Sequence, residues 1–225
     1  MRLSNLLSMS AICMGVSLGV SAADDGFPEV TIDGLHLVKG TQLAHVYTKP
    51  NVDLSQYGRI LLARPQIAFT KNWLRRQNAI PNTTITAADM ENIKKNLSDL
   101  FMEVFKQELQ NNGGYVLVDG AAEDVLAVNP AIVNLNVLAP DTPRTRGTRS
   151  AIDSVGEMTL YLELLDSVTG DMLVKILDHQ VDRSRARIQL RNSIRNEAAA
   201  REMLTEWAVI LRNGLDEARL AVRGK

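Results

Sequence analysis

Residues 155–182 read VGEMTLYLELLDSVTGDMLVKILDHQVD, and this stretch decides the fold of the chain. Apolar side chains recur at every second position in both of its halves: Met158, Leu160, Leu162 and Leu164, then Met172, Val174 and Ile176. A period of two places alternate side chains on one face of a β-strand. We assign His179 and Val181 to the continuation of this pattern, so each half is predicted to form a strand.

The segment between the two halves, DSVTGD, has the composition of a tight turn. Asp166, Ser167 and Thr169 can hydrogen-bond the local backbone, and Gly170 tolerates a positive φ. The two strands are therefore predicted to form a long antiparallel hairpin in the middle of a sheet. Asp166 and Asp171 lack the closely repeated oxygen ligands of a calcium loop, so we assign them to the turn.

Two amphipathic helices are predicted on either side of this hairpin in the sequence. Thr86 and Asp89 have the spacing of a capping box, and the apolar stripe that follows recurs every three or four residues: Met90, Ile93, Leu97, Leu100, Phe101, Val104 and Leu109. The second helix is expected from Glu197 to about Ala221, with a stripe that contains Ala200, Met203, Leu204, Trp207, Ile210 and Leu211.

The order of these elements predicts an α+β fold. Tyr57–Phe69 contains a buried strand that Pro65 places at an edge or bulge, and Lys71–Ile85 reads as a polar loop. We expect a single two-layer domain with a mixed or mainly antiparallel sheet, a central hairpin and two helices on one face. Residues 23–50 are interpreted as an extended N-terminal arm with short strands at Leu35–Val38 and Leu43–Tyr47, and residues 51–222 as the single α/β domain.

The first residues resemble a secretory signal peptide. Arg2 precedes the uncharged apolar run Leu6–Val20, which is too short to span a bilayer, and Val20-Ser21-Ala22 offers a small-residue cleavage site. We assign residues 1–22 to the signal peptide, with cleavage after Ala23 as the alternative. The protein is therefore predicted to be secreted into the periplasm.

Cys13 raises the alternative that the protein is a lipoprotein. A lipobox has an apolar residue three positions before the lipidated cysteine and a small residue directly before it. Ser10 and Ile12 occupy these two positions. We therefore favour an ordinary cysteine of the signal peptide over lipidation at Cys13.

Composition narrows the possible partners and cofactors. Removal of residues 1–22 takes away one of the 25 basic residues, none of the 26 acidic residues and the single cysteine. The resulting formal charge of −2 argues against general nucleic-acid binding, and thiolate chemistry and disulfides are excluded. No apolar segment after residue 22 is long enough to be transmembrane, and no cofactor motif is found.

Two arginine-rich segments flank the hairpin and form the candidate binding site. The first contains Arg144, Arg146 and Arg149, and the second contains Arg183, Arg185 and Arg187. A hairpin returns to its starting end, so both segments are expected at the same end of the sheet. Guanidinium groups bind phosphates and carboxylates in a bidentate manner, which predicts an anionic envelope component or an envelope protein as partner. The alternative is that both segments are solvated loops.

No catalytic or metal-binding pattern is found in the mature sequence. A G-x-S-x-G match at residues 15–19 lies in the signal peptide and not between a strand and a helix. The three histidines lack metal-ligand spacing, and His179 is expected to be packed or hydrogen-bonded. Glu157 and Glu163 share a face of one strand but lie too far apart to act as an acid–base pair.

The order of the motifs resembles a bacterial family, domain of unknown function 3313, whose members are exported proteins and lipoproteins mostly from proteobacteria. The motifs are DGLHLVKG (33–40), YGRILLARPQIAF (57–69), ELLDSVTGDML (163–173) and EMLTEWAVILRNGLDEA (202–218). The resemblance covers about residues 35–218 and assigns no functional residue. Many members have a clear lipobox, and this sequence departs from them there.

Two functions are compatible with the sequence. The first is a non-enzymatic periplasmic or cell-envelope binding or assembly module, which the export signal and the absence of a nucleophile, metal or cofactor motif favour. The alternative is an envelope hydrolase with a dispersed active site. A cleft that brings together His179, Asp178 and an arginine would favour the hydrolase.

Overall fold

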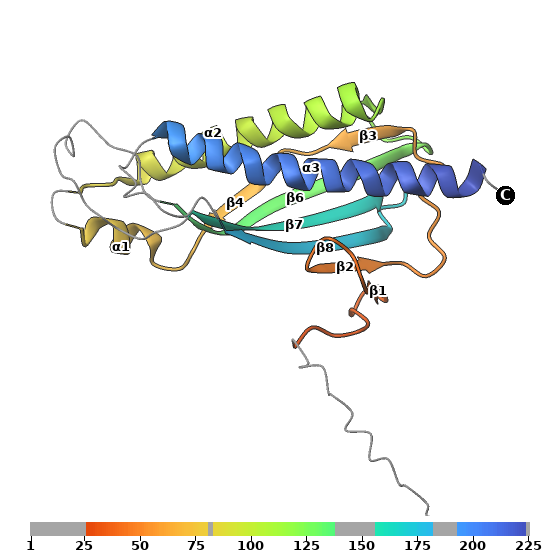
Figure 1. The fold of residues 1–225 in the computed structure, drawn as a ribbon, viewed down its shortest axis with the longest axis horizontal. Coiled ribbons are helices and arrows are strands. Elements are labelled where there is room, and N and C mark those ends of the chain that lie inside the picture. Colours follow the sequence, from red (N-terminus) through yellow and green to blue (C-terminus); the bar gives the residue numbers. More distant parts are fainter. Residues whose placement is uncertain (1–25, 81–82, 138–155, 182–192, 224–225) are drawn as a thin grey trace, which may run out of the picture.

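A computed structural model describes residues 26–80, 83–137, 156–181 and 193–223 of the chain (Figure 1). The elements follow in the order β1 (His36–Val38), β2 (His45–Thr48), β3 (Arg59–Leu62), β4 (Gln66–Phe69), α1 (Trp73–Asn78), α2 (Ala87–Lys106), a π-helical segment (Gln107–Asn112), β5 (Val116–Leu117), β6 (Val125–Asn136), β7 (Glu157–Asp166), β8 (Met172–Val181) and α3 (Ser193–Arg223).

The sheet is mixed and contains all eight strands of the described residues. Its order is β1-β2-β8-β7-β6-β3-β5, and β4 also pairs with β6. The pairings β1–β2, β2–β8, β8–β7 and β7–β6 are antiparallel. The pairings of β6 with β3 and β4, and of β3 with β5, are parallel. The α+β domain with a central hairpin and two helices on one face is therefore confirmed (Figure 1).

The central hairpin, β7 and β8, has the predicted turn. The Asp166 carboxylate accepts hydrogen bonds from the backbone N–H groups of Val168 and Thr169, and Gly170 has a φ of 73°. The Thr169 N–H, followed by the Tyr57 hydroxyl and then the Val168 N–H, lowers the pKa of Asp166. The aspartate therefore stabilises the turn in its ionised form, as the sequence predicts.

The helix-facing side of the hairpin is mainly apolar, with Asp178 and Gln180 as its polar residues. Leu160, Leu162 and Leu164 pair with Asp178, Ile176 and Val174 in the register of β7 and β8, so Asp178 faces the helices. His179 pairs with Thr159 and lies on the opposite face. The prediction that His179 and Val181 continue the apolar face is wrong, because alternation continues through Asp178 without a break.

Helices α2 and α3 cover one face of the sheet and run in the same direction (Figure 1). The Thr86–Asp89 capping box that begins α2 is confirmed, with reciprocal hydrogen bonds between each side chain and the other residue's backbone. Leu100, Phe101 and Leu162 are buried beneath the helices, as their spacing predicts. The core is made by these two helices and the inner faces of β6, β7 and β8.

Strand β6 changes the residues that it presents to the helices. Asn134 has a φ of 53°, and β6 has one residue more than β7 and one more than β4 between consecutive pairings at this point. This is a β-bulge. Ile132 faces the helices before the bulge, and Leu135 and Val137 pack against the core after it.

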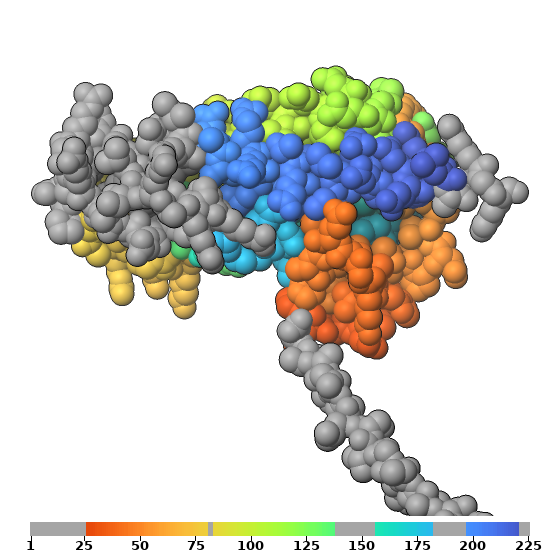
Figure 2. All heavy atoms as spheres, in the orientation of Figure 1, coloured from red at the N-terminus to blue at the C-terminus, as the bar shows by residue number. Residues whose placement is uncertain are grey.

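One of the two remaining segments differs from its predicted form. Residues expected to form a loop, Lys71–Ile85, contain the short helix α1, and Trp73 is buried there with its indole N–H donating to the Val137 carbonyl at 2.8 Å. The short strands expected in the N-terminal arm are present as β1 and β2, and they extend the sheet beside β8. Figure 2 shows this N-terminal part as a protrusion, with α2 and α3 side by side on another part of the surface.

Candidate functional site

The six arginines of the predicted binding site lie outside the described residues. They are Arg144, Arg146, Arg149, Arg183, Arg185 and Arg187. Their segments connect to elements that are described, namely β6, β7, β8 and α3. The basic site therefore stays a prediction, and the candidate site below is built from described residues.

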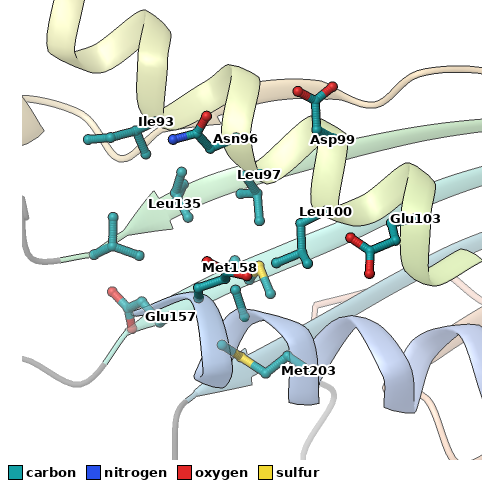
Figure 3. Close-up of a pocket in the computed structure, with 13 residues that line it drawn as sticks. Ile93, Asn96, Leu97, Asp99, Leu100, Glu103, Leu135, Glu157, Met158 and Met203 are labelled. Carbon is teal, nitrogen blue, oxygen red and sulfur yellow. The ribbon is translucent and has the colours of Figure 1, made fainter. Parts of the chain in front are cut away.

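A cavity of about 500 Å³ lies between α2, α3 and the sheet (Figure 3). Its floor and walls are mainly apolar: Ile93, Leu97 and Leu100 from α2, Leu135 and Val137 at the end of β6, Met158 from β7, and Ala200 and Met203 from α3. The volume is within the range of about 300–1,000 Å³ that is typical of small-molecule sites. We call this cavity the interhelical cleft.

Local sequence explains why the cleft stays open. The side chains that α2 and α3 contribute here are aliphatic, and Ala200 is small. Further along the same helices, Phe101 stacks on Phe105 with ring centroids 3.9 Å apart, and Trp207 is 1% exposed. Large aromatic rings fill the interhelical space there, whereas leucine, alanine and methionine leave it partly empty.

Polar side chains line the cleft next to this apolar floor. They are Asn96, Asp99 and Glu103 on α2, Glu157 on β7 and Glu197 on α3. Figure 3 shows Asn96, Asp99 and Glu103 along α2 and Glu157 on the other side of the space. An apolar floor with a few polar groups at its border is the usual form of a small-ligand site.

Three of the four carboxylates form ion pairs with lysine or arginine, and two of these, Asp99 and Glu103, have close cationic partners. Asp99 binds Arg64 and Lys95 at 2.7 Å each, and Glu103 binds Arg201 at 2.8 Å. These hydrogen bonds and ion pairs lower the pKa of Asp99 and of Glu103, so both carboxylates are ionised at neutral pH. Glu197 shares Arg201 at the longer distance of 3.5 Å.

Glu157 has a different set of partners. Its carboxylate accepts a hydrogen bond from the Asn136 amide at 2.9 Å and lies 3.8 Å from His179 Nε2. The other ring nitrogen, Nδ1, is 3.0 Å from the Thr159 hydroxyl. Among the described residues, no lysine or arginine forms an ion pair with Glu157.

The line Thr159–His179–Glu157 contains a hydroxyl, an imidazole and a carboxylate, as a hydrolase would require. Thr159 is only 7% exposed, however, and neither Thr159 nor His179 lines the interhelical cleft. The hydroxyl therefore has little access to a substrate in this arrangement.

Asp178 and His179 are not brought together, because they lie on opposite faces of β8. Asp178 is 8% exposed, accepts from the Trp207 indole N–H at 2.7 Å and accepts from the Ala44 backbone N–H at 2.8 Å. Its role is to connect α3 and the N-terminal segment to the sheet. The cleft that would favour a hydrolase, with both residues and an arginine, is not formed by the described residues.

Two further features of the described part of the chain concern ligands and membranes. Its histidine, aspartate and glutamate side chains do not gather in groups of three that could hold a metal ion. None of its helices is both long enough and apolar enough to cross a membrane.

The family model described as "Protein of unknown function (DUF3313)" matches residues 26–211. The chain belongs to this family. The match includes α2, the part of α3 that lines the interhelical cleft and the eight strands of the described residues, so the resemblance seen in the ordered motifs is confirmed. No curated protein matches the chain.

Several solved structures are similar to the DUF3313 chain in their general layout. The PelC dodecamer from Paraburkholderia phytofirmans is 11% identical, with a TM-score of 0.38 over 74% of this chain and 96% of PelC. A protein provisionally described as a lipoprotein from Caulobacter crescentus CB15 is 13% identical, with a TM-score of 0.36 over 77% of this chain and 95% of that one. A provisional neuraminyllactose-binding hemagglutinin homolog from Helicobacter pylori is 12% identical, with a TM-score of 0.40 over 74% and 92%. Likenesses of this size carry no functional argument.

Several residues that line the cleft were predicted to face inward, but the cavity between them was not predicted. Ile93, Leu97 and Leu100 belong to the predicted stripe of α2, and Met203 belongs to that of α3. A stripe predicts which side chains face inward and does not predict whether the opposing helix fills the space between them. The sequence feature that indicates a cavity here is the small side chain of Ala200, which lies opposite aliphatic residues.

Proposed function

We propose that this DUF3313 protein is a non-enzymatic binding module of the cell envelope, and that the interhelical cleft holds an apolar group of its ligand. The observation that supports this proposal is the cleft itself, with about 500 Å³ of space above an apolar floor. An apolar group that enters such a space leaves water and gains dispersion contacts with the aliphatic lining. The predicted signal peptide supports the periplasmic location.

The cleft also has a lining that can adjust to its occupant. Met158 and Met203 contribute unbranched, polarisable side chains, which fill irregular spaces and adapt to different ligand shapes. Binding would therefore require changes of side-chain rotamer and no movement of the sheet. The arginines of the predicted basic site remain a second, independent proposal for contact with an anionic envelope component.

A fluorescent apolar probe tests the proposed cleft. N-phenyl-1-naphthylamine is neutral and becomes bright in apolar surroundings, so titration of the exported protein with this dye should give saturable binding. Ala200→Phe places a ring in the cleft and should weaken binding by about tenfold or more, which corresponds to about 1.4 kcal/mol.

The matched control is Ala198→Phe, which adds the same ring on an exposed position of the same helix. This variant should bind the dye as the native protein does. Thermal melting of all three proteins checks that they fold. Equal dye binding by Ala200→Phe and the native protein, or no binding by the native protein, would contradict the proposal.

An envelope hydrolase is the second candidate, and the line Thr159–His179–Glu157 is the observation that favours it. Hydrolysis of short-chain p-nitrophenyl esters by the exported protein would support it, provided that Thr159→Val and His179→Ala each abolish the activity. Activity that survives both substitutions would be a contaminant. The low exposure of Thr159 makes the binding module the better supported function.

A further inference from the structure

The interhelical cleft has an inner end, which lies toward the C-termini of α2 and α3. On α2 the lining ends at Glu103, and on α3 it ends at Met203. The next residue of each helix, Val104 and Leu204, is buried in the core and does not line the cleft. The two helices therefore border the cleft only up to this level and fill the interhelical space beyond it.

The lining of the sheet ends at the same level. Leu135 on β6 and Met158 on β7 line the cleft, as Figure 3 shows. Ile132 and Leu160, which pair with each other one inward-facing row further on, are buried and do not line it. Leu160 pairs in turn with Asp178 on β8. We call these three residues, Ile132, Leu160 and Asp178, the end row of the cleft.

Helix α3 holds the end row in place. The Trp207 indole N–H donates to the Asp178 carboxylate at 2.7 Å, and the indole is 1% exposed. Displacement of this ring would leave a buried donor and a buried acceptor without each other, which is costly. The inner end is therefore rigid, whereas the flexible side chains of Met158 and Met203 can adapt to an occupant.

The cleft is longer along the helices than across them. Its lining on α2 extends over ten residue steps, from Ile93 to Glu103, which is about 15 Å at a rise of 1.5 Å per residue. The axes of packed helices are typically about 8–10 Å apart, and side chains occupy part of that distance. A slot of this form matches a linear alkyl chain better than a wide, rigid ring system.

From this geometry we propose that the interhelical cleft binds one linear alkyl chain and that the end row limits the length of that chain. The inference rests on the proposed function and names the ligand class as amphiphiles with a single chain. The terminal methyl group points to Leu160, and the head group stays in solvent. Each methylene that enters the cleft leaves water and adds affinity, whereas a methylene beyond the end row meets a filled core and adds none.

Displacement of N-phenyl-1-naphthylamine by alkyl maltosides tests the length limit. The series from hexyl to tetradecyl maltoside keeps one neutral head group and changes only the chain, and each compound is used below its micellar concentration. We expect the affinity to rise about threefold to fourfold for each added methylene. The rise should stop at one chain length within the series, because the chain has then reached the end row.

Substitution of Leu160 tests which residues set the limit. Leu160→Ala removes three carbon atoms from the end row, so the limit should move to chains longer by about two methylenes. Leu160→Val removes less and should move it by about one, which keeps the test available if Leu160→Ala does not fold. The matched control is Leu164→Ala, on the same face of β7, where Leu164 is buried and pairs with Val128 and Val174 away from the cleft. This variant should be destabilised in the same way and keep the native limit.

The outcomes separate this inference from the proposed function. Affinity that rises through tetradecyl maltoside without a limit would overturn the inference and leave the apolar cleft in place. A limit that both Leu160 variants retain, or that Leu164→Ala shifts equally, would overturn the role of the end row. Binding of the dye without displacement by any maltoside would overturn the single-chain ligand. Failure of the native protein to bind the dye and all the maltosides would overturn both proposals.

Discussion

The two ends of the α2–α3 pair use different chemistry to join the same two helices. At the end that contains the C-termini, Arg212 binds Glu108 at 2.6 Å and Asp216 at 3.0 Å, and the Tyr115 hydroxyl donates to Asp216. Arg219 lies over the Tyr115 ring, 3.6 Å from its centroid. The other end has the interhelical cleft and ion pairs with more exposed side chains.

The difference shows how one helix pair can be both a scaffold and a site. Aromatic packing and an enclosed polar network fix the C-terminal end, so the helices do not depend on contacts at the cleft to stay on the sheet. A binding site needs unfilled space, which costs stability because the lining loses contacts. The closed end offsets that cost within the same layer.

Truncation of core side chains should show the largest difference between the two ends. Phe105 is 0% exposed, and Phe105→Ala should destabilise the protein by about 3–5 kcal/mol. Leu97 is 8% exposed and borders the cleft, so Leu97→Ala should cost only about 2 kcal/mol, at the low end for such changes. Urea unfolding measures both values. A larger cost at Leu97 would mean that the cleft is closed in solution.

Glycine positions give the next largest effects, with opposite signs. A Cβ atom at Gly113 would lie 2.9 Å from the Leu109 carbonyl oxygen and 3.0 Å from Arg212 Cγ. Gly113→Ala should therefore cost about 1–3 kcal/mol through overpacking at the closed end.

The control is Gly214→Ala, at an exposed position of α3 where a Cβ atom would meet nothing within 4 Å. Alanine is the better helix former, so this change should stabilise the protein by about 0.5–1 kcal/mol. Thermal or urea unfolding of both variants tests the pair. Equal effects of the two substitutions would show that the close approach at Gly113 relaxes without cost.

Loss of the interhelical ion pairs should lower the stability by a smaller amount, and the loss should be larger at the closed end than at the cleft. The side chains of Arg212 and Glu108 are 23% and 10% exposed, whereas those of Arg201 and Glu103 are 40% and 58% exposed. Arg212→Met should therefore lower the melting temperature more than Arg201→Met, because it leaves the enclosed Glu108 without its cation. Added salt should weaken the contribution of Arg201 more strongly. The reverse ranking in differential scanning calorimetry would contradict the division into a closed and an open end.

An alkaline titration should give the smallest signal, since it reports on individual phenols. Burial, followed by the hydrogen bond to Asp166, raises the pKa of Tyr57 to about 12, and burial also raises the pKa of Tyr115. The folded state holds these protons more tightly than the unfolded state, whose phenols have a pKa of about 10. This stabilisation is complete below about pH 10 and is lost as the pH rises through about 12.

Tyrosinate absorbance measures the effect. Tyr57 and Tyr115 should remain protonated until about pH 12 or until the protein unfolds, and Tyr57→Phe should remove part of the late transition. Simultaneous ionisation of all four tyrosines near pH 10 in the folded protein would contradict the enclosure of these two hydroxyl groups.

Features with a local cause could be predicted from the sequence. The turn at Asp166 and the capping box at Thr86 depend on residues only a few positions apart, and the stripes of α2 and α3 follow from helical periodicity. Alternation along β8 places Asp178 on the inner face, but the donors that satisfy it there, Trp207 and Ala44, are distant in the sequence. No local pattern identifies these donors, and the same is true of the interhelical cleft.

The short helix α1 was missed for a related reason. Lys71–Ile85 is polar, and the partners that bury Trp73 come from other elements, including Phe69 and the Val137 carbonyl. Tertiary contacts therefore override a weak local preference. The predicted basic site stays a prediction, because Arg144–Arg149 and Arg183–Arg187 lie outside the described residues.

The bulge at Asn134 has a consequence for any alignment of DUF3313 sequences. Residues before it face the helices at even numbers and residues after it at odd numbers, so the floor of the cleft depends on one additional residue in β6. A relative that lacks this residue could have the same apolar residues in β6. The positions next to Leu135 and Val137 in the sequence would then face the cleft in their place. A one-residue gap at this position would therefore divide the family into members with and without this cleft floor, even where every apolar residue is retained.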